Sequence, residues 1–340
     1  MVDRRPVIWA FAGMTQEWPQ MGKALMEVPV FKGTVERFHK ILKEKDESIN
    51  LIHILTTEDK TIFEKLINPF IAITTMQIGF INIMKCLDLK PDYILGHSLG
   101  EIACGYADGC LTEEQAILCA YYRGLVTKNG KVKGRMAVVF MSAKELELIL
   151  PEGVENGCHN TPNMCTITGN EDAVEKFLLS LDESTKNQNK IMRTSNTPYH
   201  SSLIKHLGVE LEDYLKKVIP NPKKRSEKWY SSSVSSEDWD KEGNRSCSAE
   251  YFVNNYTGVV YFAEVCKLLP QKNILLDMSP SGIYSSVAEQ NFQDSLCVSL
   301  AKKYNLDGMR ILITKLRELK KQGIDFDLNK LGVDLKKFED

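Results

Sequence analysis

The chain has 340 residues, which is long enough for one large domain or two, and folding would bury about three quarters of its unfolded surface. Apolar residues make up 43% and charged residues 26%, the balance of a soluble globular protein, and the net charge of −2 gives no reason to expect nucleic acid or a membrane as a partner. No run is expected to span a membrane. Nine cysteines without a Cys-x-x-Cys pair or a metal-ligand spacing predict reduced thiols in the cytoplasm and no metal site.

The first part of the chain alternates apolar strands with helices. Residues 7–11 form a continuous apolar run, typical of a strand buried on both faces. Helical patterns follow at 21–45, 59–66 and 72–86. Residues 93–95 predict another strand. Thr112, with Gln115 in the capping-box position, predicts the start of a helix that carries Arg123.

The pattern changes at residue 134, where shorter elements begin. Strands are predicted at 136–141, from 157, at 164–168 and at 190–194, with helices at 143–150 and 172–180. This order is β-α-β-β-α-β, the ferredoxin-like arrangement. We therefore expect an α/β fold with a mostly parallel sheet, in which a core formed by 1–133 and 197–340 carries a ferredoxin-like subdomain at 134–196.

Longer elements return after this insertion. Predicted are a helix at 201–217, a basic loop at 221–228, a serine-rich loop at 231–248, a segment at 250–266, a strand at 274–278 and a helix at 306–321. The start at Arg4 and Arg5 and the tail after Gly323 have the composition of linkers.

The most informative motif is Gly96-His97-Ser98-Leu99-Gly100, which lies between an apolar strand end and a small, apolar helix. A Gly-x-Ser-x-Gly turn between a strand and a helix is a nucleophile elbow, in which glycines allow a sharp turn that exposes the serine. The N–H groups at the helix start then face whatever binds beside Ser98. The alternative is an ordinary helix-capping serine, and the apolar flanks favour the elbow. Such a site suits acyl transfer.

A serine nucleophile needs a base, and the chain has six histidines. His200 lies in a corner between the inserted subdomain and the returning core helix, where pockets form, and we favour it over His206. The alternative for His200 is an exposed helix-capping residue. His97 is adjacent to the nucleophile, so its side chain diverges from Ser98 and is predicted to be a pocket wall.

Arg123 stands on an otherwise apolar helix. An arginine there either extends to solvent, the commoner case, or pairs with a buried group. The functional alternative is a guanidinium that binds a substrate carboxylate through two parallel hydrogen bonds.

These motifs occur together with others in a fixed order along nearly the whole chain. The set includes Phe11-Ala12-Gly13-Met14, Gly96-His97-Ser98-Leu99-Gly100-Glu101, Tyr122-Arg123-Gly124, Cys158-His159-Asn160, Tyr199-His200-Ser201 and Asn254-Asn255. In this set the chain resembles the malonyl/acetyl-CoA acyl carrier protein transacylase of animal-type fatty acid synthases. It is more distantly similar to bacterial malonyl transacylases and to acyltransferase domains of polyketide synthases.

The resemblance implies a Ser–His dyad on a hydrolase-like α/β core. By that resemblance Ser98 is the nucleophile, His200 the base, and Arg123 the residue that grips the malonyl carboxylate. The backbone N–H groups of Met14 and Leu99 correspond to the oxyanion hole.

The resemblance also assigns the residues around this centre. It implies that Gln77 and Phe70 line the pocket together with Tyr199. Main-chain carbonyls between Asn255 and Gly258 are expected to orient His200.

The chain departs from the family pattern at three places. Thr15 stands where the family has glycine, Tyr199 replaces a phenylalanine, and Gly258-Val259-Val260 replaces a Ser/Asn-Pro-Val stretch. None of these changes removes a catalytic group.

The resemblance implies transfer of malonyl, and of acetyl, from coenzyme A to the phosphopantetheine thiol of an acyl carrier protein for fatty acid synthesis. Acyl-CoA is then the substrate and no cofactor is expected. Other domains of a fatty acid synthase are expected partners, because the linker-like ends suggest an excised piece. The alternatives are a serine thioesterase or hydrolase, and an inactive scaffold domain.

Carrier proteins are acidic, so we expect a basic patch near the pocket. The densest basic run consists of Lys216, Lys217, Lys223, Lys224, Arg225 and Lys228. The alternative for this run is a solvated helix end and loop.

Overall fold

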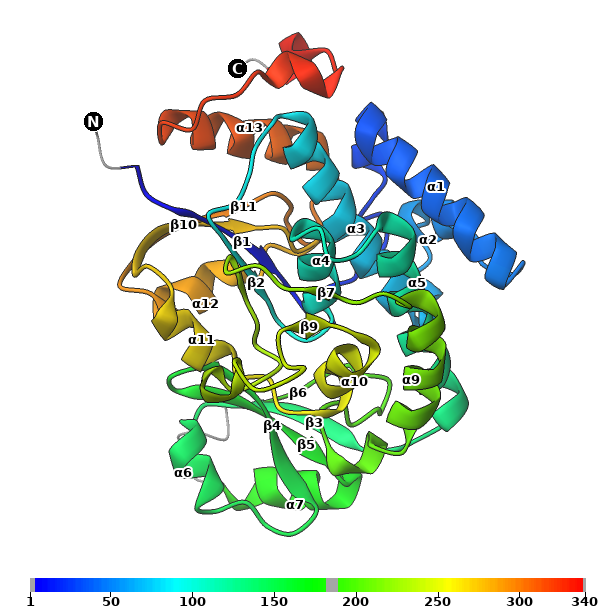
Figure 1. Ribbon diagram of the computed structural model, residues 1–340, viewed down its shortest axis with the longest axis vertical. Helices are drawn as coiled ribbons and strands as arrows, with labels where there is room; N and C mark the ends of the chain where they lie inside the picture. The colour runs from blue at the N-terminus through cyan, green and yellow to red at the C-terminus, as the bar shows by residue number, and fades with distance from the viewer. Residues whose placement is uncertain (1–3, 182–188, 339–340) are drawn as a thin grey trace.

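A computed structural model describes residues 4–181 and 189–338 of the chain. Its centre is a five-stranded sheet with the order β11–β10–β1–β2–β8, in which every pair of strands is parallel (Figure 1). The strands are β1 (Val7–Phe11), β2 (Tyr93–Gly96), β8 (Trp229–Tyr230), β10 (Lys272–Asp277) and β11 (Asp294–Ser299). The carboxyl ends of these strands meet at one edge of the sheet.

Alternate residues of β1 enter two separate apolar clusters, which explains why its sequence is apolar throughout. Val7, Trp9 and Phe11 belong to the larger cluster. Ile8 and Ala10 belong to a smaller cluster on the other face of the sheet. Side chains alternate between the two faces of a strand, so this sheet is covered on both sides.

Helices cover both faces (Figure 1). The larger cluster includes residues of α1 (Pro29–Lys45), α3 (Ile67–Cys86) and α5 (Glu113–Gly130), and the smaller one includes residues of α11 (Phe262–Leu268) and α12 (Tyr284–Asn291). Further helices of the described core are α2 (Leu51–Thr56), α4 (Gly100–Ala107), α9 (Leu207–Val218), α10 (Ala249–Thr257) and α13 (Gly308–Lys321).

Helix α3 corrects one expectation from the sequence. It is long and apolar enough to cross a membrane by length and composition, although no such run was expected. The whole of its apolar window is buried inside the protein. A helix that is apolar on all sides is typical of the core of a large domain.

The inserted segment forms a second sheet of four antiparallel strands with the order β4–β5–β3–β6. The strands are β3 (Arg135–Val139), β4 (Val154–Thr161), β5 (Met164–Gly169) and β6 (Lys190–Ile191). Helices α6 (Ala143–Glu147) and α7 (Glu171–Ser180) share an apolar cluster with it. The expected β-α-β-β-α-β order is confirmed, while the boundaries 134 and 196 stay predictions, and residues 182–188 lie outside the described part.

Other elements differ from the expectations. The helix expected at 21–45 is interrupted before Pro29, because proline lacks an N–H and starts a new helix at its first position. The segment 59–66 forms only the short 3₁₀ helix η2 (Ile62–Glu64). The capping box of Thr112 and Gln115 is confirmed, with both hydrogen bonds present.

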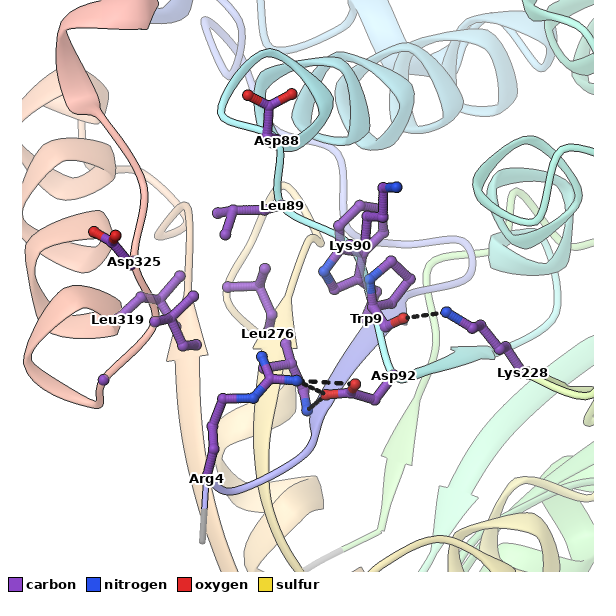
Figure 2. A pocket seen from close by; sticks show the side chains of 14 residues that line it. Arg4, Trp9, Asp88, Leu89, Lys90, Asp92, Lys228, Leu276, Leu319 and Asp325 are labelled. Atoms are coloured by element: carbon purple, nitrogen blue, oxygen red, sulfur yellow. Dashed lines mark hydrogen bonds and ion pairs between the residues drawn. The ribbon is translucent and has the colours of Figure 1, made fainter. Parts of the chain in front are cut away.

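At the edge of the sheet opposite the elbow lies a cavity of about 410 Å³ (Figure 2). Trp9 and Leu276 line its apolar part, and charged side chains surround it. Arg4 donates two hydrogen bonds to Asp92, of 2.9 and 3.0 Å, and Lys228 donates to the Pro91 carbonyl at 3.1 Å. These charged groups are therefore already bonded within the protein.

Candidate active site

Ser98 lies in a sharp turn between β2 and α4, at the carboxyl end of the central strands. Its backbone is left-handed, with φ of +52°, an uncommon value for a residue with a Cβ. A Cβ on Gly100 would lie 2.1 Å from the Phe11 carbonyl oxygen, and one on Gly96 would lie 2.6 Å from the Cys104 Sγ. Both positions therefore require glycine, and the turn has the close approaches expected of a nucleophile elbow.

The structure brings Ser98 and His200 together across 102 residues of sequence. The Ser98 Oγ lies 2.7 Å from the His200 Nε2, and the His200 Nδ1 lies 2.8 Å from the Gly258 carbonyl oxygen. Because a carbonyl only accepts hydrogen bonds, the neutral ring carries its proton on Nδ1. Nε2 is then free to accept the serine proton, which is the arrangement a general base needs.

Burial keeps this imidazole neutral. The His200 side chain is buried, and burial together with the Arg123 cation lowers its pKa from 6.5 to about 3. The bond to Gly258 opposes this shift. The ring is therefore unprotonated, and able to act as a base, over the whole neutral range.

Two backbone N–H groups next to the serine lack acceptors within the protein. Among residues 4–181 and 189–338, neither the Met14 N–H nor the Leu99 N–H makes a hydrogen bond. Met14 follows β1 and Leu99 is the residue before α4. Free donors beside a nucleophile are what an oxyanion hole requires.

Arg123 is buried rather than extended to solvent. Its Nη1 donates to the Asn255 Oδ1 at 2.5 Å and its Nη2 to the Ser98 Oγ at 3.2 Å, while the guanidinium lies 5.1 Å from the centre of the Tyr256 ring. Burial lowers its pKa to about 10, and none of the groups that oppose the shift is a carboxylate. Its Nε has no partner in the described chain.

Asn255 has a different set of contacts from the one expected. Besides accepting from Arg123, its Nδ2 donates to the Ser98 carbonyl at 3.0 Å and to the Ser233 Oγ at 2.8 Å. Of the two residues expected to orient His200, only Gly258 bonds the ring in the described chain. Asn255 instead connects Arg123 to the elbow.

A cavity of about 1,020 Å³ opens above Ser98 and His200. His97, Met14 and Tyr199 line it, as expected. His97 is held by the Asn160 Oδ1, 2.9 Å from its Nε2, and Asn160 is a contact that the sequence reasoning did not identify.

Two expected pocket residues lie behind the cavity wall. Gln77 is fully buried on α3, and its Nε2 donates to the Ala12 carbonyl at 2.7 Å. Phe70, also on α3, packs edge-on against Tyr199 with ring centres 6.0 Å apart. Neither side chain is part of the cavity lining, and neither is that of Arg123, which reaches the site only through its contact with the Ser98 Oγ.

A second buried group near the elbow was missed from the sequence. The Glu101 carboxylate, on the first turn of α4, accepts from the Trp229 Nε1 at 2.7 Å, the Tyr251 hydroxyl at 2.6 Å, and the backbone N–H and hydroxyl of Ser232 at 2.8 and 3.0 Å. The Ser232 hydroxyl also lies 2.6 Å from the Gly96 carbonyl oxygen, so its single proton is shared between this carbonyl and the carboxylate. The sequence signal for this buried carboxylate was the position of Glu101, directly after the last glycine of the elbow.

The basic run is not at the cavity. None of its six residues lines the cavity above Ser98, and Lys228 lines the cavity at the opposite edge (Figure 2). Arg225 is buried, with its guanidinium 5.2 Å from the Trp229 ring and 5.0 Å from the Tyr251 ring, so its assignment to an exposed patch is wrong. The basic side chains that do line the active-site cavity are Lys190, Arg193 and Lys303.

Within the described chain, no group of three or more His, Cys, Asp or Glu side chains is arranged to hold a metal ion. That the protein needs no metal and no other cofactor stays a prediction from the sequence.

Comparison with known proteins relates this geometry to a family. A family model described as "Acyl transferase domain" matches residues 8–325. The highly reducing polyketide synthase gloL of Glarea lozoyensis is 29% identical over 289 residues, which cover 81% of this chain and 11% of that protein. The 6-hydroxymellein synthase cdmE of Talaromyces verruculosus is 28% identical, over 88% of this chain and 12% of that protein. The chain thus spans a small part of the length of these relatives.

Solved structures share the fold at lower identity. The acyltransferase domain from the second module of the salinomycin polyketide synthase aligns with a TM-score of 0.84 and 18% identity, over 98% of this chain and 77% of that one. The malonyl-CoA:ACP transacylase of a Synechocystis species aligns with a TM-score of 0.75 and 16% identity, over 89% of this chain and 99% of that one. The expected α/β fold, with a mostly parallel sheet and a small antiparallel subdomain, is confirmed.

Proposed function

Because this chain belongs to the acyl transferase domain family, we propose that it moves malonyl groups from coenzyme A to the phosphopantetheine thiol of an acyl carrier protein through an ester on Ser98. The observation that carries the proposal is the buried guanidinium of Arg123, 3.2 Å from the nucleophile and without a carboxylate partner in the described chain. A malonyl group attached at Ser98 would bring a carboxylate to this cation.

The first half of the reaction follows from the geometry of the dyad. Ser98 attacks the thioester carbonyl as its proton passes to the His200 Nε2, 2.7 Å away. The oxyanion faces the free N–H groups of Met14 and Leu99. The C–S bond breaks, and coenzyme A leaves with the proton that His200 returns.

The second half reverses these steps with a different thiol. The phosphopantetheine thiol gives its proton to His200 and attacks the ester carbonyl, and Ser98 leaves with the proton. The single imidazole serves both halves because the Gly258 carbonyl keeps its Nδ1 protonated, with Nε2 toward the serine. Acyl-CoA is the substrate, and no other cofactor is part of this scheme.

Selection of the acyl group rests on charge. A carboxylate that pairs with Arg123 can accept two parallel hydrogen bonds and neutralise a cation whose charged form is disfavoured by burial. Acetyl has no carboxylate to offer and is proposed as a poorer substrate of the same serine.

The wider system is also a proposal. The resemblance to animal-type fatty acid synthases, and the relative gloL that is named as a polyketide synthase, support a carrier protein in a multidomain synthase. The polyketide synthase relatives favour extender-unit loading in polyketide assembly, with fatty acid synthesis as the second candidate.

The decisive experiment is the intact mass of the protein after brief incubation with malonyl-CoA, beside the Ser98→Ala variant. We expect a malonyl adduct on the wild type alone, which is removed when a carrier protein is added. Free malonate released faster than malonyl-carrier forms would instead indicate a thioesterase. Absence of both an adduct and free coenzyme A would contradict the proposal and indicate a scaffold domain.

A further inference from the structure

The turn that carries the oxyanion donor Met14 is strained. Thr15, the next residue, has φ of +71°, in the left-handed region. Threonine is β-branched, and such residues are genuine outliers there, because the Cβ crowds the backbone. A strained conformation persists only where the surrounding structure holds it. The contacts of this turn should therefore include groups that prevent its relaxation.

Three side chains are hydrogen-bonded at this turn: Lys303, Gln16, which belongs to the turn itself, and Ser281, which reaches the turn through Gln16. The Lys303 Nζ donates to the Thr15 carbonyl at 3.3 Å. The Gln16 Nε2 donates to the Met14 carbonyl at 3.3 Å, and its Oε1 accepts from the Ser281 hydroxyl. Both carbonyls flanking the strained residue are thus held by side-chain donors.

The contacts made by Lys303 and Ser281 come from two loops that are hydrogen-bonded to each other. The Lys303 backbone N–H donates to the Ser281 carbonyl at 3.0 Å, which joins the loop after β11 to the loop after β10. The Trp18 Nε1 donates to the Pro280 carbonyl at 2.7 Å and anchors the far end of the turn on the same loop. The parallel sheet explains this, because the loops after β1, β10 and β11 leave neighbouring strands at one edge.

Lys303 lies in a partly buried, charged environment. Its side chain is half-buried, and Glu17, the nearby acid, is largely buried with an Oε2 that has no hydrogen-bond partner in the described chain. Burial lowers the pKa of Lys303, Glu17 opposes this shift, and Lys190 and Arg193 add to it. Lys190 and Arg193 line the same cavity as Lys303, and Glu17 belongs to the turn that Lys303 contacts.

We propose that Lys303 and Ser281 are positioning residues which hold the strained turn at Thr15, so that the Met14 N–H faces the oxyanion formed at Ser98. The proposal rests on the acyl transfer proposed above. The two residues act through the backbone of the turn and not by contact with the reacting atoms. Loss of either contact lets Thr15 relax toward negative φ. This rotates the Met14–Thr15 peptide, and the shift passes through the Met14 Cα to the adjoining Gly13–Met14 peptide, which carries the oxyanion donor.

The turn predicts a specific interaction between two substitutions. Glycine adopts positive φ without steric cost. Thr15→Gly therefore removes the tendency of the turn to relax, which Lys303 is proposed to counteract. Lys303→Met should lower kcat about tenfold in the wild type, because removal of an oxyanion donor costs about a hundred- to a thousand-fold and here the donor is only displaced. In the Thr15→Gly background the same substitution should lower kcat less than about twofold.

The assay uses the N-acetylcysteamine thioester of malonate, with free N-acetylcysteamine as acceptor. Lys303 also lines the cavity, where a phosphate of coenzyme A would meet it. This small substrate has no phosphate, so a role limited to phosphate binding leaves its kinetics unchanged. Lys302→Met is the matched control, because it removes one positive charge from the same loop at an exposed position.

The result that supports the proposal is a loss of kcat with unchanged KM in Lys303→Met, recovery in Lys303→Arg, and a smaller loss beside Thr15→Gly. Ser281→Ala should follow the same pattern more weakly, which tests the turn even if Lys303→Met folds poorly. Equal losses in both backgrounds, or a loss seen only with malonyl-CoA, would overturn it. A wild type that forms no malonyl-Ser98 ester overturns the proposed function instead, so the two failures are distinguishable.

Discussion

Glu101 and Arg123 are both buried near the elbow, and they differ in how their charge is satisfied. The Glu101 carboxylate has four donors within hydrogen-bond distance. Burial raises its pKa, and these donors together with the nearby Arg225 oppose that shift. The Arg123 guanidinium has one amide, one hydroxyl and an aromatic ring, and its Nε is unpartnered in the described chain. Glu101 is complete within the protein, whereas Arg123 is not.

On the proposed function, this difference distinguishes a structural charge at Glu101 from a substrate-binding one at Arg123. A buried charge costs free energy unless opposite charge and hydrogen bonds compensate it, and the protein supplies both to Glu101. At Arg123 the compensation is partial, because no carboxylate of the described chain pairs with the guanidinium and its Nε has no partner. The proposed function assigns the missing carboxylate to a malonyl group on Ser98.

The largest expected effect is on acyl selection. Arg123→Ala should lower kcat/KM for malonyl-CoA by about 10² to 10³-fold, since removing one partner of a buried charge pair costs about 2–5 kcal/mol. Acetyl transfer should change by less than about tenfold, because acetyl brings no carboxylate. Rates of carrier-protein acylation with both donors measure this. Arg123→Lys is the control that keeps the charge and loses the bidentate geometry. Equal losses for both donors would contradict the assigned role.

A substitution at Glu101 should lower stability and leave acyl selection unchanged, the reverse of the effect expected at Arg123. Glu101→Gln places an amide N–H₂ among groups that donate to the carboxylate, so the free energy of unfolding should fall by about 2–4 kcal/mol. The ratio of malonyl to acetyl transfer should stay within about twofold of the wild type. Urea denaturation and the two transfer rates measure these effects, with Arg225→Met as the companion variant. A changed ratio without lost stability would make Glu101 a selectivity residue.

The pH dependence sharpens the comparison further. Arg123 lowers the pKa of His200, which is about 3 in the free protein, so kcat/KM for acetyl-CoA should be independent of His200 protonation down to about pH 4. Arg123→Ala removes this cation, so the acid limb should move to higher pH. Acetyl-CoA is the right donor because its acyl group carries no titrating carboxylate. An acid limb that stays at the same pH in Arg123→Ala would show that burial alone lowers the pKa of His200.

The smallest effect is expected at an exposed ion pair. Arg4 and Asp92, at the opposite edge of the sheet, lie 2.9 Å apart with both side chains partly in solvent. Arg4→Ala should change the free energy of unfolding by less than about 1 kcal/mol and leave both transfer rates unchanged. Thermal denaturation and the same assays provide the check. A larger loss of the free energy of unfolding would mean that the Arg4–Asp92 pair beside the cavity in Figure 2 stabilises the protein more than an exposed ion pair usually does.

Local patterns were sufficient to predict much of the fold. Five consecutive apolar residues indicated β1, and short alternating elements indicated the ferredoxin-like subdomain. β11 was missed because Asp294, Ser295 and Ser299 interrupt its apolar pattern, and β8 has only two residues. Pairing with β10 and β2 makes strands of these segments, and such pairing is a long-range property.

The site was predicted where a motif carries its own geometry. Ser98 and its glycines belong to one turn. His200 and Arg123 were singled out by their places in the chain, and the family resemblance then assigned their roles. The sequence did not reveal that Asn255 points toward Arg123 and not toward His200, since both lie within reach of the same helix end. Arg225 was placed in an exposed patch because burial beneath aromatic rings leaves no local signal.

The segment that holds His200 is itself held by the small subdomain. The Val260 N–H donates to the Gly157 carbonyl at 3.0 Å, and the His159 N–H donates to the Val260 carbonyl at 2.8 Å. Gly258, whose carbonyl fixes the imidazole, is two residues away. For chimeric enzymes this sets the crossover points. A subdomain grafted from a relative should carry 157–160 and 258–261 as a matched pair, or the recipient will fold with a misaligned base.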